Sequence, residues 1–475
     1  MFVRKVVNVL CFLALASCAP SKNSSGGVTT TEPSKTNGIE TCLALGKKNT
    51  NLADTSSVVP TLTTLDPNYG QYIVKYKEAK GLTPSGQPLR EYHVSTMKLT
   101  SISGDLYSLQ IKGTIKEKSK ILAQVAAESD VDYVEPDYPI EPIPQTPAAI
   151  MPDDPYFSKQ WFHSTLNSLA AWSVDEGSDE IIAAVVDTGV DYTHPDLAEN
   201  MWINKDEIPN NGKDDDGNGY IDDVYGWNFT ANNNDPRSSS KAPHGSHVAG
   251  LIGARGNNHV GVVGVAPKVK LMALKFMDDS GAGITSNAVR AIDYAIQKKV
   301  FLINNSWGSN RFSRTLSDAI SRAAKAGILF FAAAGNGDKG VGYNIDATPW
   351  YPASYTQWNV FSVAATTIGD RLTDFSNFSK NKVDVAAPGY AIYSTVSGVS
   401  YQMMSGTSMA TPIVAGLAVL VKATNPDLDP TQILNIIRES SDKLPTLQDK
   451  VRSGGRVDSY NAVMLARASK NCALQ

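Results

Sequence analysis

The sequence predicts an α/β fold class, a doubly wound and mostly parallel sheet with helices on both faces, preceded by a small α+β domain. Short apolar runs, such as residues 181–186, 300–303 and 328–332, alternate with segments of helical periodicity, such as 286–298 and 315–326. Strands buried on both faces of a parallel sheet are continuous apolar runs, and parallel strands need crossover connections that are usually helices. The alternation therefore predicts strands covered by helices on both sides.

The composition excludes several classes of protein. The chain has 475 residues, of which 42% are hydrophobic and 19% are charged, against a usual charged share of about 25%. This balance excludes a mostly disordered chain and a coiled coil, and the length allows roughly three compact units. The net charge of −4 gives no electrostatic reason to bind nucleic acid. No apolar run after the N-terminus reaches the roughly 20 residues that span a bilayer.

The first 18 residues predict a signal peptide. Two basic residues precede the apolar run 6–16, which has the length of a secretory signal core. Residues 15–18 resemble a bacterial lipobox, in which the protein is cut before the cysteine and Cys18 is acylated. The alternative is an ordinary signal peptide cut near residues 16–19. By resemblance to Gram-negative lipoproteins, Ala19 in place of Asp implies an exported protein that a lipid alone anchors to the outer membrane or cell surface.

Two cysteines lie outside this leader. Cys42 and Cys472 remain once Cys11 leaves with the signal and Cys18 carries lipid. Disulfides form in an exported protein. A bridge between the two remaining cysteines and a pair of free thiols are both open at this point.

The N-terminal third divides by composition. Residues 19–67 are rich in Ser, Thr, Asn and Gly and cannot bury enough apolar surface to fold, so we expect a flexible linker. Residues 68–140 carry strand patterns at 71–76 and 105–111 and apolar helical spacing from 115 to 126, followed by a closing strand. This segment predicts the small α+β domain.

The rest of the chain is one large unit with a linker before it. Residues 141–152 are rich in proline, which fixes φ and lacks a backbone donor, so we expect an extended segment that a protease can reach. The α/β domain follows over residues 153–467, and residues 468–475 form a C-terminal tail.

Three polar residues follow strands or begin helices of the predicted sheet. Asp187 closes the apolar run 181–186, His244 precedes a run of small residues, and Ser408 precedes a buried helix predicted over 410–421. Ligands of open parallel sheets gather beyond the carboxyl ends of the strands. A serine nucleophile needs a base within hydrogen-bond reach, and the base needs a carboxylate that orients it. The three residues predict nucleophilic catalysis.

The segments around these residues carry a family resemblance. Residues 187–189, 244–250 and 406–412, read Asp-Thr-Gly, His-Gly-Ser-His-Val-Ala-Gly and Gly-Thr-Ser-Met-Ala-Thr-Pro, resemble the three signatures of the subtilisin-like serine proteases in their family order. The resemblance covers about residues 153–467. It implies that Ser408 is the nucleophile, His244 the general base and Asp187 the residue that orients the base. Ser246 departs from the family, where Thr is commoner, but it is also small and hydroxylated.

The resemblance also implies an oxyanion donor and two substrate-binding segments. Asn336 matches the side chain that donates to the oxyanion of the tetrahedral intermediate, together with the backbone N–H of Ser408. An extended polypeptide substrate would pair with two exposed edges. These substrate-binding residues are Gly281, Ala282, Gly283, Ser306, Trp307 and Gly308. No buried charge is evident near the primary specificity pocket, so we expect a preference for an apolar side chain.

His247 and an acidic loop raise the question of a metal. His244 and His247 share a helix face, but no Glu supplies the hydrolytic pattern of a zinc helix, and the resemblance assigns His247 to packing. Residues 206–225 are acidic, and Tyr225 stands where a calcium loop has its bidentate Glu. The residues that match such a loop are Asp214, Asp216, Asn218, Gly219 and Asp222. A structural calcium site and a hydrated acidic loop are both open, and the resemblance implies no cofactor for catalysis.

The resemblance gives the small domain a role. Residues 68–140 are similar to the inhibitory propeptide of the family, which acts as an intramolecular inhibitor and folding template, although Pro84 and Pro88 make its first helix hard to place. The sequence therefore predicts an exported, lipid-anchored, monomeric serine endopeptidase made as a self-processed zymogen. The alternative is a non-catalytic binding module on the cell surface that keeps the fold. An esterase of the Gly-x-Ser-x-Gly type lacks that motif around Ser408.

Overall fold

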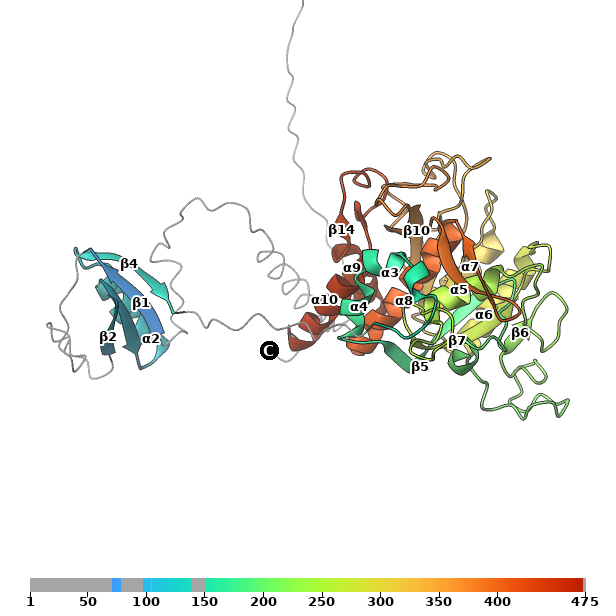
Figure 1. Ribbon diagram of the computed structural model, residues 1–475, viewed down its shortest axis with the longest axis horizontal. Helices are drawn as coiled ribbons and strands as arrows, with labels where there is room; N and C mark the ends of the chain where they lie inside the picture. The colour runs from blue at the N-terminus through green and yellow to red at the C-terminus, as the bar shows by residue number, and fades with distance from the viewer. Residues whose placement is uncertain (1–70, 78–96, 104, 138–150, 473–475) are drawn as a thin grey trace, which may run out of the picture.

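The computed structural model describes residues 71–77, 97–103, 105–137 and 151–472, which form a small N-terminal unit and a large C-terminal unit (Figure 1). The predicted signal peptide with Cys18, the linker over 19–67 with Cys42, and residues 141–150 of the second predicted linker lie outside the described residues. The pairing of Cys42 with Cys472 therefore stays a prediction.

The small unit is a four-stranded antiparallel sheet with a helix. Its strands lie in the order β2 (Met97–Ser103), β3 (Leu106–Ile111), β1 (Gln71–Tyr76) and β4 (Val131–Pro136), and its helix is α2 (Ile115–Ala126). Tyr72, Leu109 and Val125 are fully buried in a core of its own. Thr114 begins α2 with a capping box that Glu117 completes. The sequence predicted each of these elements except β2, which is rich in Ser and Thr.

The large unit contains a nine-stranded sheet whose strand pairs are parallel except at one edge, as predicted. Its order is β14 (Asp442–Lys443), β15 (Gly455–Arg456), β11 (Val385–Pro388), β10 (Val360–Thr366), β9 (Leu329–Ala333), β8 (Leu302–Asn305), β5 (Gly177–Asp187), β7 (Lys268–Lys275) and β6 (Gly226–Asn228). After β5 the chain forms β6 and β7 on one side of β5 and then crosses to form β8 on its other side. The strand order therefore reverses beside β5, which is where α/β sheets place their sites.

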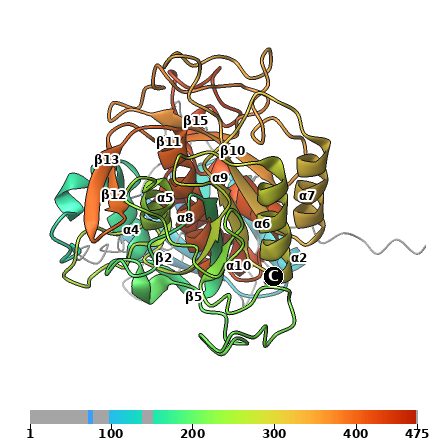
Figure 2. The same cartoon turned by 90° about the vertical axis from the view of Figure 1, so that its right-hand side faces the viewer.

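Helices cover both faces of this sheet, because successive side chains of a strand point to opposite sides. In β5, Ala183 and Val185 belong to one core, while Ala184 and Val186 belong to the other. The first core is covered by α5 (His244–Gly253), α8 (Thr407–Thr424), α9 (Pro430–Glu439) and α10 (Ser459–Cys472), and the second by α6 (Thr285–Gln297) and α7 (Arg314–Lys325). Figure 2 shows α6 and α7 side by side.

Shorter elements complete the large unit. They are η2 (Phe157–Lys159), α3 (Phe162–Thr165), α4 (Ser168–Trp172), η3 (Ala198–Asn200) and an antiparallel hairpin of β12 (Ile392–Val396) and β13 (Ser400–Met404). The predicted helices over 286–298 and 315–326 agree with α6 and α7 to within one residue. The predicted start of the buried helix at residue 410 is three residues late, because α8 begins at Thr407 and so contains Ser408 in its first turn.

One helix of the described part of the chain is long and apolar enough to resemble a membrane span. It is α8, whose 18 residues have a mean hydropathy of 1.4 and are 78% buried. The helix contacts strands β5, β9, β10 and β11 and helices α5 and α10. Its apolar character is therefore explained by its place in the core of the large unit.

Candidate active site

Asp187 and His244 form a hydrogen-bonded pair at the carboxyl end of β5. The His244 Nδ1–H donates to Asp187 Oδ1 over 2.8 Å, because a carboxylate at this distance only accepts. Asp187 is fully buried, and its Oδ1 also accepts from the Thr188 N–H at 2.7 Å. The His244 side chain is 32% exposed. The imidazole thus has one nitrogen held by the buried carboxylate and an edge open to the surface.

The turn after β5 positions the start of α5. The Thr188 hydroxyl accepts from the Gly245 N–H at 3.0 Å and donates to the Ala242 carbonyl at 2.9 Å. A Cβ on Gly245 would overlap the Gly189 carbonyl oxygen, so only glycine lets the first turn of α5 lie against the strand end. Sequence reasoning did not assign a role to Thr188, although a hydroxyl directly after the carboxylate was a visible signal.

Burial and charge act in opposite directions on His244. Burial disfavours the imidazolium, but the Asp187 charge and hydrogen bond outweigh burial and raise the pKa of His244 above 6.5. An imidazole with a raised pKa accepts a proton more readily when a neighbouring hydroxyl gives one up.

Ser408 is the second residue of α8 and lies beside the end of β8. Its hydroxyl donates to the Ser306 carbonyl at 3.0 Å, and the Ser306 hydroxyl donates to the Ser408 carbonyl at 2.9 Å. Helices α5 and α8 pack together, which brings the starts of both helices to the same edge of the sheet. Among the described residues, the Ser408 hydroxyl thus bonds the Ser306 carbonyl and makes no hydrogen bond to His244.

Asn336 follows β9, and Thr407 fixes its side chain. The Thr407 N–H and hydroxyl both donate to Asn336 Oδ1, at 2.8 and 2.9 Å. The Thr407 hydroxyl also accepts from the Gly335 N–H at 3.1 Å. Asn336 is an exposed residue, and with its amide oxygen held in this way its NH₂ group is left to donate elsewhere. The role of Thr407 was missed in the sequence, where it stands as the hydroxyl residue directly before Ser408.

His247 lies apart from this chemistry, in agreement with the packing role that the resemblance implied. It is fully buried, and its Nε2 bonds the carbonyls of Ile392 and Gln402 at 3.1 and 3.0 Å. Burial and the charge of His244 lower the pKa of His247 to about 3. His247 is therefore neutral near pH 7 and ties α5 to the hairpin of β12 and β13. The Ser246 hydroxyl accepts from the Asp191 N–H at 2.8 Å.

The two predicted substrate-binding segments lie beside the site. The first is a tight loop in which Gly281 has a φ of +79° and the Asp278 carboxylate accepts the Ala282 N–H at 3.1 Å. In the second, the Trp307 indole packs on Phe276 with ring centroids 4.8 Å apart and donates to the Val186 carbonyl at 2.9 Å. Ser306 contacts Ser408 directly, as described above. Both segments follow strands of the sheet, β7 and β8.

The acidic loop forms a network in which a lysine already neutralises charge. Lys298 Nζ forms an ion pair with Asp216 and lies 3.6 Å from Asp223 Oδ2. Glu207 accepts backbone N–H groups of residues 215, 216 and 222. One oxygen of each of Glu207, Asp216 and Asp223 lies within 4.8 Å of the others. Of the residues predicted to hold calcium, only Asp216 belongs to this cluster, while Asp214 and Asp222 accept backbone N–H groups.

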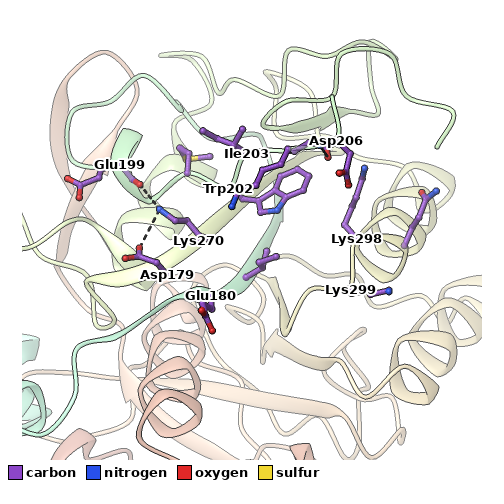
Figure 3. Close-up of a pocket in the computed structure, with 14 residues that line it drawn as sticks. Asp179, Glu180, Glu199, Trp202, Ile203, Asp206, Lys270, Lys298 and Lys299 are labelled. Atoms are coloured by element: carbon purple, nitrogen blue, oxygen red, sulfur yellow. Dashed lines mark hydrogen bonds and ion pairs between the residues drawn. The ribbon is translucent and has the colours of Figure 1, made fainter. Parts of the chain in front are cut away.

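A cavity of about 780 Å³ lies away from the candidate site. It is lined by Ile182 and Lys270, which pair across the amino-terminal halves of β5 and β7, whereas Asp187 ends β5. Figure 3 shows Lys270 bound to the Glu199 carbonyl at 2.8 Å and to Asp179 at 3.3 Å. The cavity is thus at the opposite end of the strands from Asp187, and Lys298 of the acidic loop's network also lines it.

Comparisons with known proteins agree with this geometry. A model of the subtilase family matches residues 178–456, which include all four polar residues of the candidate site. The chain is 38% identical over 345 residues to subtilisin-like protease 1 of Plasmodium berghei, covering 66% of this chain and 57% of the relative. It spans about half the length of this and related Plasmodium proteins.

Two bacterial relatives are covered more completely. The thermophilic serine proteinase of Bacillus sp. (strain AK1) is 34% identical over 395 residues, which cover 83% of this chain and 87% of the relative. Thermitase of Thermoactinomyces vulgaris is 35% identical over 313 residues, covering 66% of this chain and 99% of the relative. By its parallel sheet, by the arrangement at the sheet's carboxyl edge and by these matches, the chain belongs to the subtilase family.

Proposed function

We propose that this protein is a serine endopeptidase that hydrolyses peptide bonds through an acyl-enzyme. The observation that carries the proposal is the 2.8 Å bond between His244 Nδ1 and the buried Asp187 carboxylate, at the start of a helix that packs against the helix of Ser408. The two bacterial relatives are named as a thermophilic serine proteinase and as thermitase, and these names support the same chemistry.

Each residue has a step in the reaction. The Ser408 Oγ attacks the carbonyl carbon, and His244 takes the hydroxyl proton on Nε2 while Asp187 holds Nδ1. The Asn336 NH₂ group and the Ser408 N–H donate to the oxygen that becomes negative. The Ser408 N–H is free to do so because the first N–H groups of a helix have no partner within the helix. His244 then gives its proton to the leaving amine, and water releases the acyl group by the same route.

Labelling by a fluorophosphonate tests this function. The reagent modifies a serine only where a base activates the hydroxyl and donors stabilise the oxyanion. We expect the purified protein to be labelled at Ser408 and to cleave an unfolded protein, and Ser408→Ala to lose both. A folded wild-type protein that is not labelled would favour the alternative, a non-catalytic binding module with the same fold.

We further propose that the protein is made as an exported precursor whose small unit is an inhibitory propeptide. The small unit has a hydrophobic core of its own, which supports a role separate from that of the large unit. The match to the Bacillus proteinase covers 83% of the chain, so it necessarily extends well upstream of residue 151 and includes part of the N-terminal region. Lipidation at Cys18, anchoring at the outer membrane or cell surface and a monomeric state belong to the same proposal. Ser408→Ala should accumulate as the unprocessed chain.

A structural calcium ion is a further proposal for the acidic loop. It is supported by the mutual approach of oxygens from Glu207, Asp216 and Asp223, which suit a hard cation. Lys298 holds two of these carboxylates, so calcium has to compete with an ammonium group that is already present. Calcium would stabilise the loop and would not take part in catalysis.

A further inference from the structure

The space beside the reacting carbonyl can be located from the strand ends. Strands β8 and β9 are neighbours in parallel register, with Asn305 opposite Ala332. Residues 306–308 continue from β8, and residues 334–336 continue from β9. Since Ser408 Oγ lies 3.0 Å from the Ser306 carbonyl and Asn336 supplies the proposed oxyanion donor, the carbonyl under attack must lie between these two segments. On the proposed function, we expect the side chain on the adjoining α-carbon to enter the space between them.

The indole of Trp350 packs against both segments. A Cβ built on Gly308 would overlap Trp350 Nε1, and one built on Gly335 would lie 2.9 Å from the Nε1 and Cδ1 atoms of the same ring. Real Cβ atoms essentially never make contacts under 3.0 Å. The two glycines therefore leave room for the indole, which fills space that a larger substrate side chain would need.

The backbone around Trp350 fixes the position of the ring. The Trp350 N–H donates to the Ser354 hydroxyl at 3.1 Å, and the Trp350 carbonyl accepts from the Ser354 N–H at 2.8 Å. Tyr351 and Ser309 exchange two backbone hydrogen bonds of 2.7 Å, which tie the segment of Trp350 to the one that follows Gly308. The main chain from which the indole projects is therefore held beside Gly308.

The contact of the indole with its surroundings is steric. Its N–H is buried and has no acceptor among the described residues. Replacing Trp350 by a smaller residue therefore removes volume without leaving a hydrogen-bond partner unpaired. Substitutions of Trp350 therefore test how the volume of this side chain limits the size of the substrate side chain.

We infer that Trp350 limits the side chain of the residue whose carbonyl is attacked to a small one, such as Gly, Ala or Ser. This inference rests on the proposed endopeptidase function. It also revises the general preference for an apolar side chain that the sequence suggested, because size, and not only polarity, decides which residues fit. A missing or excess methylene in such a pocket changes kcat/KM by about 10–200-fold.

The test is a series of fluorogenic peptides that differ only in this residue, Ala, Ser, Leu or Phe. For the wild-type enzyme we expect kcat/KM for Ala to exceed that for Phe by at least about tenfold. Trp350→Gly should raise the Phe-to-Ala ratio by at least about tenfold, and Trp350→Phe should move it less and in the same direction. The exposed Trp358 gives the control, since Trp358→Ala should leave the ratio unchanged. A ratio within one preparation does not depend on how much of the variant folds.

Equal cleavage after Ala and Phe by the wild type would overturn the inference and leave the endopeptidase function standing. An unchanged ratio in both Trp350 variants would do the same. A wild type that neither cleaves any peptide nor reacts with fluorophosphonate would overturn the proposed function, and this inference with it.

Discussion

Thr407 holds the amide oxygen of Asn336 with two hydrogen bonds, one from its N–H at 2.8 Å and one from its hydroxyl at 2.9 Å. The two residues come from different elements, the start of α8 and the loop after β9. Because an amide group is planar, fixing its oxygen also fixes the direction of its NH₂ group. The residue before the proposed nucleophile thus orients the proposed oxyanion donor, and one helix start positions both.

Thr407→Val should lower kcat by about tenfold to hundredfold with little change in KM, because a small displacement of an oriented donor is costly. The Thr407 N–H bond to Asn336 remains in this variant, so the loss should be smaller than for Asn336→Ala. Removing the corresponding donor from a subtilisin costs about 10²–10³ in kcat. Steady-state kinetics on one peptide measures both. Thr407→Ser keeps the hydroxyl and should retain most of the activity; a loss as large as in Thr407→Val would contradict the role.

The pH dependence of the reaction should report the pKa of His244. Since the Asp187 charge raises this pKa above 6.5 despite burial, the neutral base is lost as the pH falls through a value above 6.5. We expect kcat/KM and the rate of fluorophosphonate labelling to decline together below that value. An inflection below 6.5 in both profiles would contradict the electrostatic account.

Asp187→Asn should lower kcat by about 10⁴, because the amide favours the wrong tautomer of His244 while leaving the geometry intact. Rates of peptide cleavage, normalised to folded protein by circular dichroism, measure the loss. Asp191→Asn offers a matched control, since Asp191 accepts from Thr193 and Gly398 and does not bond His244. Comparable losses in both variants would show that the effect arises from the fold and not from His244.

The fold could be predicted because its strands are long apolar runs whose pattern depends on local sequence. The runs at 181–186 and 328–332 became β5 and β9, and the helices between strands kept their periodicity. The elements that were missed are short or polar. β14 and β15 have two residues each and exist only because they pair with other parts of the sheet. β13 exposes most of its residues and is defined by its pairing with β12.

The site could be predicted as a set of residues but not as a set of contacts. The positions of Asp187, His244, Ser408 and Asn336 follow from motifs near strand ends. The direction of each side chain depends on partners that are distant in sequence, such as Thr188 for α5 and Thr407 for Asn336. The contact of Trp350 with Gly308 and Gly335 brings together residues up to 42 positions apart, and only the packed structure shows it.

Two buried histidines should make the protein sensitive to acid. Burial lowers the pKa of both His163 and His247 to about 3, so between pH 6.5 and about 3 the unfolded chain binds protons that the folded chain does not. The stabilisation from these two groups is therefore fully present above pH 6.5 and decreases as the pH falls toward 3, by up to roughly 3 kcal/mol per pH unit. Urea unfolding of Ser408→Ala, which cannot digest itself, measures this slope.

The same experiment on a second variant assigns the effect. In the Ser408→Ala background, His163→Gln should reduce the slope by about half, because one of two titrating groups is lost. An unchanged slope would show that groups other than His163 account for the acid sensitivity.

Lys298→Met should destabilise the large unit by about 3–5 kcal/mol, the usual cost of breaking a buried ion pair by removing one partner. The side chains of Lys298 and Asp216 are only 10% and 13% exposed, and Asp223 is fully buried, so solvent screens this ion pair weakly. Burial already raises the pKa of Asp223, and its hydrogen bonds to Tyr294, Asn204 and Asn218 with the charge of Lys298 only partly offset this. Thermal unfolding in EGTA measures the loss.

Adding calcium to Lys298→Met decides between the two interpretations of the acidic loop. If Glu207, Asp216 and Asp223 bind calcium, the variant should regain stability in millimolar calcium, because the ion replaces the missing positive charge, and it should lose that gain with EGTA. Asp223→Asn combined with Lys298→Met is the control, since it removes a ligand and should abolish the response. A loop that is only a hydrated ion-pair network predicts no calcium-dependent shift in either variant, and that result would remove the calcium proposal.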